Sequence, residues 1–96
     1  MISKDDILRR RAQILAIARR YGASDVRLFG SVARGEASET SDVDLVVRFE
    51  SGRSLLDHGG LVMDLRELLG ATVDVIDEEG MRPRFRQAIE REAVPL

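Results

Sequence analysis

The sequence predicts an α/β fold in which helices flank a small mixed β-sheet of about three to four strands. Two short apolar runs are separated by a connection with only ten residues between Ser31 and Asp42, and a third run follows over twenty residues after the second. A connection as short as the first favours antiparallel pairing, whereas parallel strands need a crossover of a dozen or more residues. We therefore expect the first two strands to be antiparallel and the second and third to be parallel.

The chain begins with a predicted helix that runs from the cap Ser3 to Tyr21. Its apolar residues recur near a period of 3.6, and Gly22 marks its end. A first strand is predicted at about residues 26–29. A helix of one or two turns should follow, with Ser31 as its N-cap, because serine is a preferred residue at that position.

The second predicted strand, residues 43–49, carries apolar residues at alternate positions that should enter the core. A turn at residues 50–53 follows, and a helix is predicted over residues 54–69. Gly59 and Gly60 lie inside this helix, where each costs about 1 kcal/mol relative to alanine. They either break the helix into two pieces or permit a close packing contact.

The third predicted strand, residues 71–76, has Asp74 between two valines. The acidic residues 77–79 that follow it are interpreted as solvated loop charges. The last helix should begin at Pro83, since proline suits the first turn of a helix, and continue to Glu92.

The composition is typical of one globular domain spanning residues 1–96. Hydrophobic residues make up 44% of the chain and charged residues 33%, the balance of an ordinary soluble protein. A chain of this size buries somewhat over about 60% of its unfolded surface, enough for one core but not for a second substrate domain. Neither a secretory leader nor a membrane-spanning apolar run is seen, so a cytoplasmic protein is expected. The lack of cysteine excludes disulfides and thiolate metal sites.

The net charge of −2 argues against a general nucleic-acid binder, because neutralising many phosphates requires a basic surface. Basic residues nevertheless concentrate in the first and last predicted helices. Solvated helix faces are the simpler explanation, and contact with an acidic protein partner or RNA is the alternative. The residues are Arg9, Arg10, Arg11, Arg19 and Arg20 in the first helix and Arg82, Arg84, Arg86 and Arg91 in the last.

Asp42 and Asp44 form an Asp-x-Asp motif where the second strand begins. Residues two apart in a strand point to the same face, so both carboxylates should lie on the side opposite the core. Two like charges this close oppose each other's ionisation unless a cation lies between them. Hard oxygen ligands suit Mg²⁺, whose coordination is often completed by substrate phosphates. An isolated motif of this kind is more often a turn followed by a solvated strand residue, so its context must decide.

That context is the pair Gly30-Ser31 at the end of the first strand. Glycine lets the backbone approach a ligand closely, and a serine hydroxyl with nearby free amides attracts anions. Arg34 could add a planar charged group for phosphate. Antiparallel pairing would place Ser31 near the Asp-x-Asp motif, so the phosphate and metal sites would coincide. This combination indicates metal-dependent transfer from a nucleoside triphosphate.

Asp74 is the candidate for a third carboxylate at the same site. A parallel third strand would place it level with the Asp-x-Asp motif on the same face of the sheet. An acidic residue among valines and isoleucine is costly to bury without a partner. An exposed edge-strand aspartate is the competing interpretation.

The motif G-S-V-A-R-G-x-x-x-x-x-S-D-V-D-L, followed by V-D-V-I, resembles the minimal nucleotidyltransferase (MNT) antitoxin group of the DNA polymerase beta-like nucleotidyltransferase superfamily. The resemblance extends over nearly the whole chain and implies a nucleotidyltransferase fold. It implies that Gly30 and Ser31 bind the triphosphate, and that Asp42 and Asp44 bind metal. Asp74 matches the family's third acid, which is also taken as the base that activates the attacking hydroxyl.

The same resemblance implies ATP as substrate, two Mg²⁺ ions, and transfer of AMP to a tyrosine of a cognate HEPN-domain toxin. The chain would then be the antitoxin of a type VII-like toxin–antitoxin pair. Two alternatives stay open: an antitoxin that acts by binding and occlusion without catalysis, and a small-molecule nucleotidyltransferase of the aminoglycoside type. RNA tailing is a weaker option. The arginine-rich helices and the apolar tail at residues 94–96 are candidate docking surfaces, and assembly with like or unlike subunits is left open.

Overall fold

A computed structural model describes residues 2–36, 38 and 42–96, and its strands form one mixed sheet in the order β3-β2-β1-β4. As predicted, β1 is antiparallel to β2 and β2 is parallel to β3. The elements in chain order are α1 (Lys4–Arg9), α2 (Arg11–Arg20), β1 (Ala23–Phe29), α3 (Gly30–Ala33), β2 (Val43–Phe49), α4 (Leu55–Leu69), β3 (Val73–Asp77), the 3₁₀ turn η1 (Glu78–Gly80), α5 (Pro83–Glu92) and β4 (Val94–Pro95).

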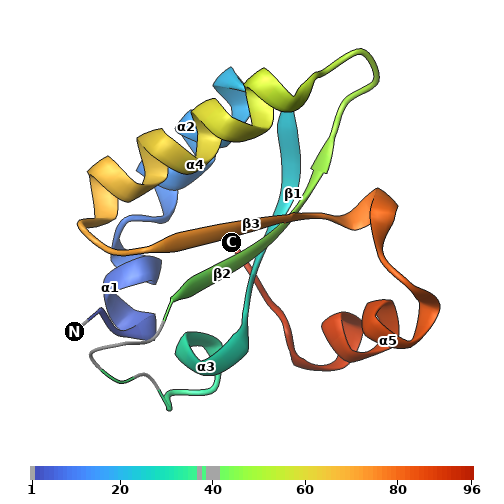
Figure 1. Cartoon of the computed structure of the whole chain (residues 1–96). Coiled ribbons are helices and arrows are strands. Elements are labelled where there is room, and N and C mark those ends of the chain that lie inside the picture. The colour runs from blue at the N-terminus through green and yellow to red at the C-terminus, as the bar shows by residue number, and fades with distance from the viewer. Residues whose placement is uncertain (1, 37, 39–41) are drawn as a thin grey trace.

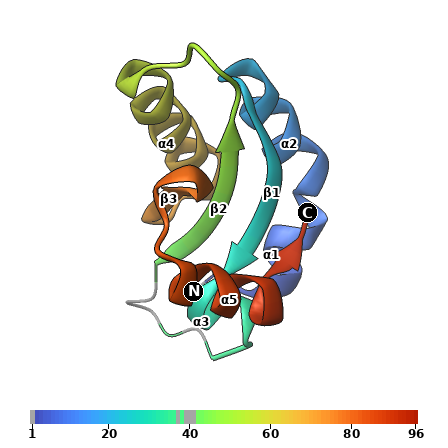
Figure 2. The ribbon, with the colours of Figure 1, turned by 90° about the vertical axis from the view of Figure 1, so that its right-hand side faces the viewer.

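The sheet has two unequal faces. Figure 1 shows α2 and α4 together on one side of the sheet and α5 on the other. The core lies on the side of α2 and α4, where Val43, Leu45 and Val47 of β2 are buried as their alternation predicted. The opposite face carries Asp44 and Asp74, and we call it the acidic face. Seen from that side, α5 lies across the end of the sheet near α3 (Figure 2).

The helix predicted over residues 3–21 is in fact two helices. Ser3 caps α1 with a capping box, as its position suggested, but α1 ends at Arg9 and α2 begins at Arg11, with Arg10 between them. Arg10 adopts φ −100° and ψ 13° and donates from Nη1 to the backbone oxygen of Leu68, 2.6 Å away. This contact joins segments far apart in the sequence, so the local helical pattern could not indicate the break.

The middle helix α4 continues unbroken through Gly59 and Gly60. The two glycines differ in their surroundings. A Cβ at Gly60 would lie 2.5 Å from Cε1 of Tyr21, whereas a Cβ at Gly59 would meet nothing within 4 Å. The Tyr21 hydroxyl donates to Asp64 across 2.6 Å, which fixes the ring over Gly60. Of the two sequence-based options, close packing is therefore the correct one, and only Gly60 requires it.

Replacing Gly60 with alanine should lower the free energy of unfolding by about 1 to 3 kcal/mol, because the added methyl group would overpack the contact with Tyr21. Gly59→Ala is the matched control and should raise the stability by about 1 kcal/mol, since alanine is the better helix former at a site with free space. Urea unfolding of the two variants checks this prediction. A destabilised Gly59→Ala, or an unaffected Gly60→Ala, would contradict it.

The C-terminal tail, one of the candidate docking surfaces in the sequence, is part of the sheet. Val94 and Pro95 form β4 and pair with Leu28 and Arg27 of β1. The backbone amide of Leu96 donates to the oxygen of Val26 over 2.9 Å. Pairing with β1 half-buries the apolar side chain of Val94, which explains why so short a segment joins the sheet.

The outer edge of β3 is covered by side chains from α4. His58 Nε2 lies 2.8 Å from the oxygen of Val75, and the Arg66 guanidinium donates to the oxygen of Val73 over 3.3 and 3.4 Å. An uncovered edge strand presents free backbone groups to other chains. These two side chains occupy the outward carbonyls of β3. Within the part of the chain that the structure describes, no helix has the length and apolar character needed to cross a membrane.

Candidate active site

The acidic face brings two of the predicted site residues together directly. Asp44 on β2 and Asp74 on β3 are register partners in the parallel ladder, so their side chains leave the same face at the same level. Phe29, the last residue of β1, is paired with Asp44 on its other side. Asp42 lies just before β2 and is exposed. This is the arrangement that the strand periodicity predicted for Asp74 relative to the Asp-x-Asp motif.

The electrostatics of Asp44 reflect this crowding. Burial raises the pKa of the half-buried Asp44 carboxyl, and the negative charges of Asp74 and Asp42 raise it further. Arg34 acts in the opposite direction and lowers the pKa, but the raising effects are larger. The ligand-free site therefore disfavours the ionised form of Asp44, and a cation among these carboxylates would relieve the repulsion.

Gly30 brings the turn between β1 and α3 against Asp44. It has φ +80°, a conformation that glycine adopts without strain. A Cβ at this position would clash with Oδ2 of Asp44. The close approach requires glycine for two independent reasons, backbone conformation and space.

Ser31 lies next to this turn but is not the N-cap of the helix, so the predicted N-cap position was wrong. The N-cap of α3 is Phe29, and Ser31 is the second residue of the helix. Its backbone oxygen accepts from the amide of Glu36 at 2.9 Å. Arg34 follows at the end of α3, and its Nε donates to Glu36 over 3.0 Å. Both residues therefore lie within four positions of Gly30, and Arg34 is engaged in an exposed ion pair with Glu36.

The described carboxylates of the acidic face do not form a closed ligand set by themselves. Within residues 2–36, 38 and 42–96, no three His, Asp or Glu side chains converge closely enough to form a ready-made metal site. The donor chemistry nevertheless fits Mg²⁺, because the paired acids supply only carboxylate oxygens and the charge of Asp74 disfavours the ionised form of Asp44. Substrate phosphates often complete such a coordination sphere.

Replacing Asp44 with asparagine should stabilise the metal-free protein at pH 7 by a few tenths of a kcal/mol, an amount that allows for solvent screening. The reason is that a carboxyl with a raised pKa holds its proton more firmly when folded than when unfolded. It therefore lowers the stability once the pH exceeds the ordinary Asp value of about 3.9.

Urea unfolding with EDTA measures this difference. Added Mg²⁺ should then stabilise the original protein and have less effect on Asp44→Asn. Equal responses to Mg²⁺ would contradict the assignment of Asp44 as a ligand.

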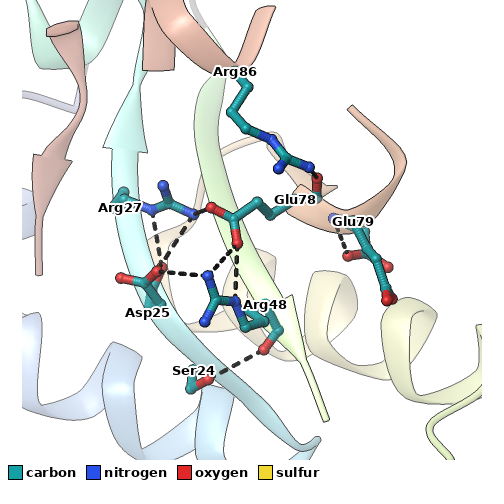
Figure 3. Close-up of polar contacts among 8 residues, drawn as sticks. Ser24, Asp25, Arg27, Arg48, Glu78, Glu79 and Arg86 are labelled. Atoms are coloured by element: carbon teal, nitrogen blue, oxygen red, sulfur yellow. Dashed lines mark hydrogen bonds and ion pairs between the residues drawn. The ribbon is translucent and has the colours of Figure 1, made fainter. Parts of the chain in front are cut away.

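A second polar cluster on the acidic face was missed by the sequence analysis. Glu78 had been interpreted as a solvated loop charge, but its side chain is only 14% exposed. It accepts from Nη2 of Arg27 and from Nε of Arg48, each over 2.9 Å (Figure 3). Arg86 of α5 donates to the backbone oxygen of Glu78 over 3.3 Å and so ties α5 to the sheet. A usable signal was present, because Arg48 is four residues beyond Asp44 and must share its face.

The same cluster includes Asp25, at a bulge in β1 between Ser24 and Arg27. Asp25 has φ 52°, the one positive value outside glycine in the described chain. Aspartate tolerates this conformation better than most residues. Its carboxylate lies 3.7 Å from Arg27 and 4.0 Å from Arg48, so residues of β1, β2, η1 and α5 meet in one polar network.

Burial acts to raise the pKa of Glu78, but hydrogen bonds from Arg48 and Arg27 outweigh it, and the pKa lies below its usual range. The resulting stability is present above the ordinary Glu value of about 4.3 and is lost as the pH falls through the lowered pKa. Glu78→Gln should therefore lower the free energy of unfolding at pH 7 by about 1 kcal/mol. The difference should shrink towards pH 3 in urea titrations, whereas the exposed neighbour Glu79→Gln should show neither effect.

Comparison with known proteins identifies the fold. Residues 10–96 match the nucleotidyltransferase domain family. This chain belongs to the nucleotidyltransferase family. A solved structure described as a "putative minimal nucleotidyltransferase" superposes with a TM-score of 0.90 at 50% identity, covering 99% of this chain and 97% of that one. Both the family and the minimal-nucleotidyltransferase resemblance predicted from the Gly-Ser and Asp-x-Asp motifs are thus confirmed.

Two further proteins are similar to this nucleotidyltransferase. The protein adenylyltransferase MntA of Thermococcus cleftensis is 40% identical over 75 residues, which is 78% of this chain and 76% of that protein. A crystal structure of a toxin–antitoxin with AMP-PNP has a TM-score of 0.76 at 21% identity, covering 88% of this chain and 69% of that one. At that level of identity the second match shows a shared fold.

For a nucleotidyltransferase, the placement of the predicted residues is coherent. The structure brings Asp44, Asp74 and Gly30 together by register and close approach. Asp42 and Arg34 are near enough to alter the pKa of Asp44. A triphosphate held at the β1–α3 turn would therefore lie beside the paired carboxylates.

Proposed function

We propose that this nucleotidyltransferase transfers AMP from ATP to a tyrosine hydroxyl of a cognate HEPN-domain toxin. The chain then acts as the antitoxin of a type VII-like toxin–antitoxin pair. The observation that carries the proposal is the register pair of Asp44 and Asp74 beside the close turn at Gly30. The adenylyltransferase relative supports a protein acceptor, and the toxin–antitoxin neighbour with AMP-PNP supports an adenine nucleotide.

In the proposed reaction, the acceptor oxygen attacks the α-phosphorus of ATP while the bond from that phosphorus to its bridging oxygen breaks. The bonding electrons leave with pyrophosphate. The proton of the acceptor hydroxyl passes to the carboxylate of Asp74, which acts as the general base. The Ser31 hydroxyl and the amides of the β1–α3 turn hold the leaving pyrophosphate, and Arg34 contributes positive charge there once it leaves Glu36.

Asp42 and Asp44, with Asp74 as the third acid, would hold two Mg²⁺ ions. Bound there, the ions would neutralise phosphate charge and fix the position of the triphosphate. The side chains must adjust when cations bind, since the described residues do not form a closed ligand set beforehand. Ligand-induced adjustment of exposed carboxylates costs little, because Asp42 and Asp74 are both on the surface.

The proposal includes two broader points. Residues 1–96 act as one catalytic domain, and the protein works in the cytoplasm, where ATP and the toxin would meet it. Because a domain this small has little room for an acceptor pocket of its own, a folded protein that docks onto it is a more suitable acceptor than an aminoglycoside. Occlusion without catalysis is the second candidate, and the clustering of Asp44 and Asp74 beside the turn at Gly30 favours catalysis over it.

Intact mass spectrometry tests the proposal. The chain is incubated with Mg²⁺ and ATP, alone and together with the protein from the adjacent gene, and both chains are weighed. We expect the partner to gain the mass of one or more AMP groups, on tyrosine when the modified peptide is sequenced. An ATP analogue with a non-cleavable link after the α-phosphate is the control and should give no gain. No mass gain with any nucleoside triphosphate would reject the transfer reaction and favour occlusion.

A further inference from the structure

Phe85 is the only aromatic among the large hydrophobic side chains that the described chain exposes, with 37% of its surface accessible. The others, Leu55, Leu56 and Met63, belong to α4 on the opposite side of the sheet. Phe85 lies in the first half of α5, which otherwise presents mostly charged residues to solvent. The accessible part of this side chain is the one large apolar surface that α5 presents to solvent.

The ring of Phe85 lies at the candidate active site. Its centroid is 5.6 Å from that of Phe29, and the two rings are perpendicular, with an interplanar angle of 87°. Phe29 is the register partner of Asp44 and directly precedes Gly30 and Ser31. An edge-to-face contact engages one edge or one face of each ring, so Phe85 retains free ring surface next to the proposed triphosphate site.

The position of Phe85 is held from several directions. Pro83 begins α5 at a first-turn position, and the buried Ile89 anchors the middle of the helix. Arg86 donates to the backbone oxygen of Glu78, whose carboxylate is bound by Arg27 and Arg48. Figure 2 shows α5 crossing the sheet at the same end as α3. The Phe85 side chain therefore extends from a helix that is fixed to the rest of the fold, and not from a loop.

We propose that Phe85 is the stacking surface for the base of the bound nucleotide. This inference rests on the proposed function, because it assumes that a nucleoside triphosphate occupies the turn at Gly30 and Ser31. Base and phosphates are joined through a single ribose, so a triphosphate held at this turn carries its base within reach of the adjoining aromatic pair. Stacking on an aromatic side chain accepts every base, and the larger purine ring gains more from it than a pyrimidine.

The test compares ligands with and without a base. Binding of Mg²⁺ with a non-cleavable ATP analogue, and of Mg²⁺ with inorganic tripolyphosphate, is measured by titration calorimetry. Phe85→Ala should weaken binding of the ATP analogue about tenfold, in the range known for loss of one aromatic–base stack. Its affinity for tripolyphosphate should stay unchanged. Phe85→Trp should restore binding of the analogue, and Met63→Ala, a matched removal of an exposed apolar side chain, should alter neither ligand.

Two results of these titrations would contradict a role of Phe85 in base stacking. Equal weakening of both ligands by Phe85→Ala would mean that the ring only supports the fold of the phosphate site. Unchanged affinity for the ATP analogue would remove any role in base binding. If the unaltered protein binds neither the ATP analogue nor tripolyphosphate, the proposed function itself fails. The titrations of the unaltered protein show this without any variant, so this failure is distinguishable from a failure of the Phe85 inference.

Discussion

Replacing Asp42 and Asp44 together with alanine is expected to lower the rate of AMP transfer at least about a thousandfold. Charge stabilisation by bound divalent cations contributes several kcal/mol to such reactions, and each 1.4 kcal/mol or so corresponds to about tenfold in rate. The double variant removes the acids that would hold them. The initial rate of labelled AMP incorporation into the partner protein measures the effect.

Unfolding would be a trivial cause of this loss, but the structure argues against it. The pKa of Asp44 is raised by burial and by its acidic neighbours, so removing the carboxylate relieves repulsion in the folded state. The double variant should therefore unfold at no lower urea concentration than the original protein. A matched control, Asp5→Ala with Glu67→Ala, removes two exposed acids from α1 and α4 and should retain full activity.

The same variant separates catalysis from occlusion. If the chain neutralises its partner by AMP transfer, the double variant should bind the partner but fail to silence it. Full neutralisation by a protein lacking Asp42 and Asp44 would overturn the enzymatic proposal.

Gly30→Ala is expected to destabilise the protein by about 2 kcal/mol and to abolish most of its activity. A non-glycine residue held at positive φ costs about 1 to 3 kcal/mol. The added Cβ would also collide with Oδ2 of Asp44, so the carboxylate would have to rotate away from its place in the site. Urea unfolding and initial transfer rates measure the two effects separately.

Gly35→Ala is the matched control for this prediction. Gly35 has φ +73°, close to the +80° of Gly30, but a Cβ there would meet nothing within 4 Å. It should share the backbone strain and keep most of the activity. If the two variants lose activity equally, contact with Asp44 is not the reason that glycine is required at position 30.

Much of the fold followed from short-range patterns in the sequence. Alternation along residues 43–49 correctly predicted which face of β2 is buried, because side chains of a strand alternate strictly. The lengths of the two connections correctly predicted antiparallel and then parallel pairing. Placing Asp74 level with Asp44 needed only these two rules, so the central geometry of the site could be inferred before any coordinates.

The features that could not be predicted depend on contacts between distant segments. At the break between α1 and α2, Arg10 donates a hydrogen bond to the backbone oxygen of Leu68. The strand β4 depends on the pairing of Val94 with Leu28 of β1. Glu78 looked like a loop charge because its partners, Arg27 and Arg48, lie on β1 and β2, which are distant from it in the sequence. The roles of Gly30, Ser31, Arg34 and the three aspartates remain predictions, since position alone does not establish chemistry.

The covered border of β3 limits how another protein can engage this one. With His58 and Arg66 on its outward carbonyls, and a proline in the two-residue strand at the far border, neither side of the sheet is a good template for an incoming strand. Recognition by β-augmentation is therefore disfavoured. A protein acceptor would therefore have to be recognised by the shape and charge of its surface around the hydroxyl. Folded proteins would be modified, and extended peptides would not.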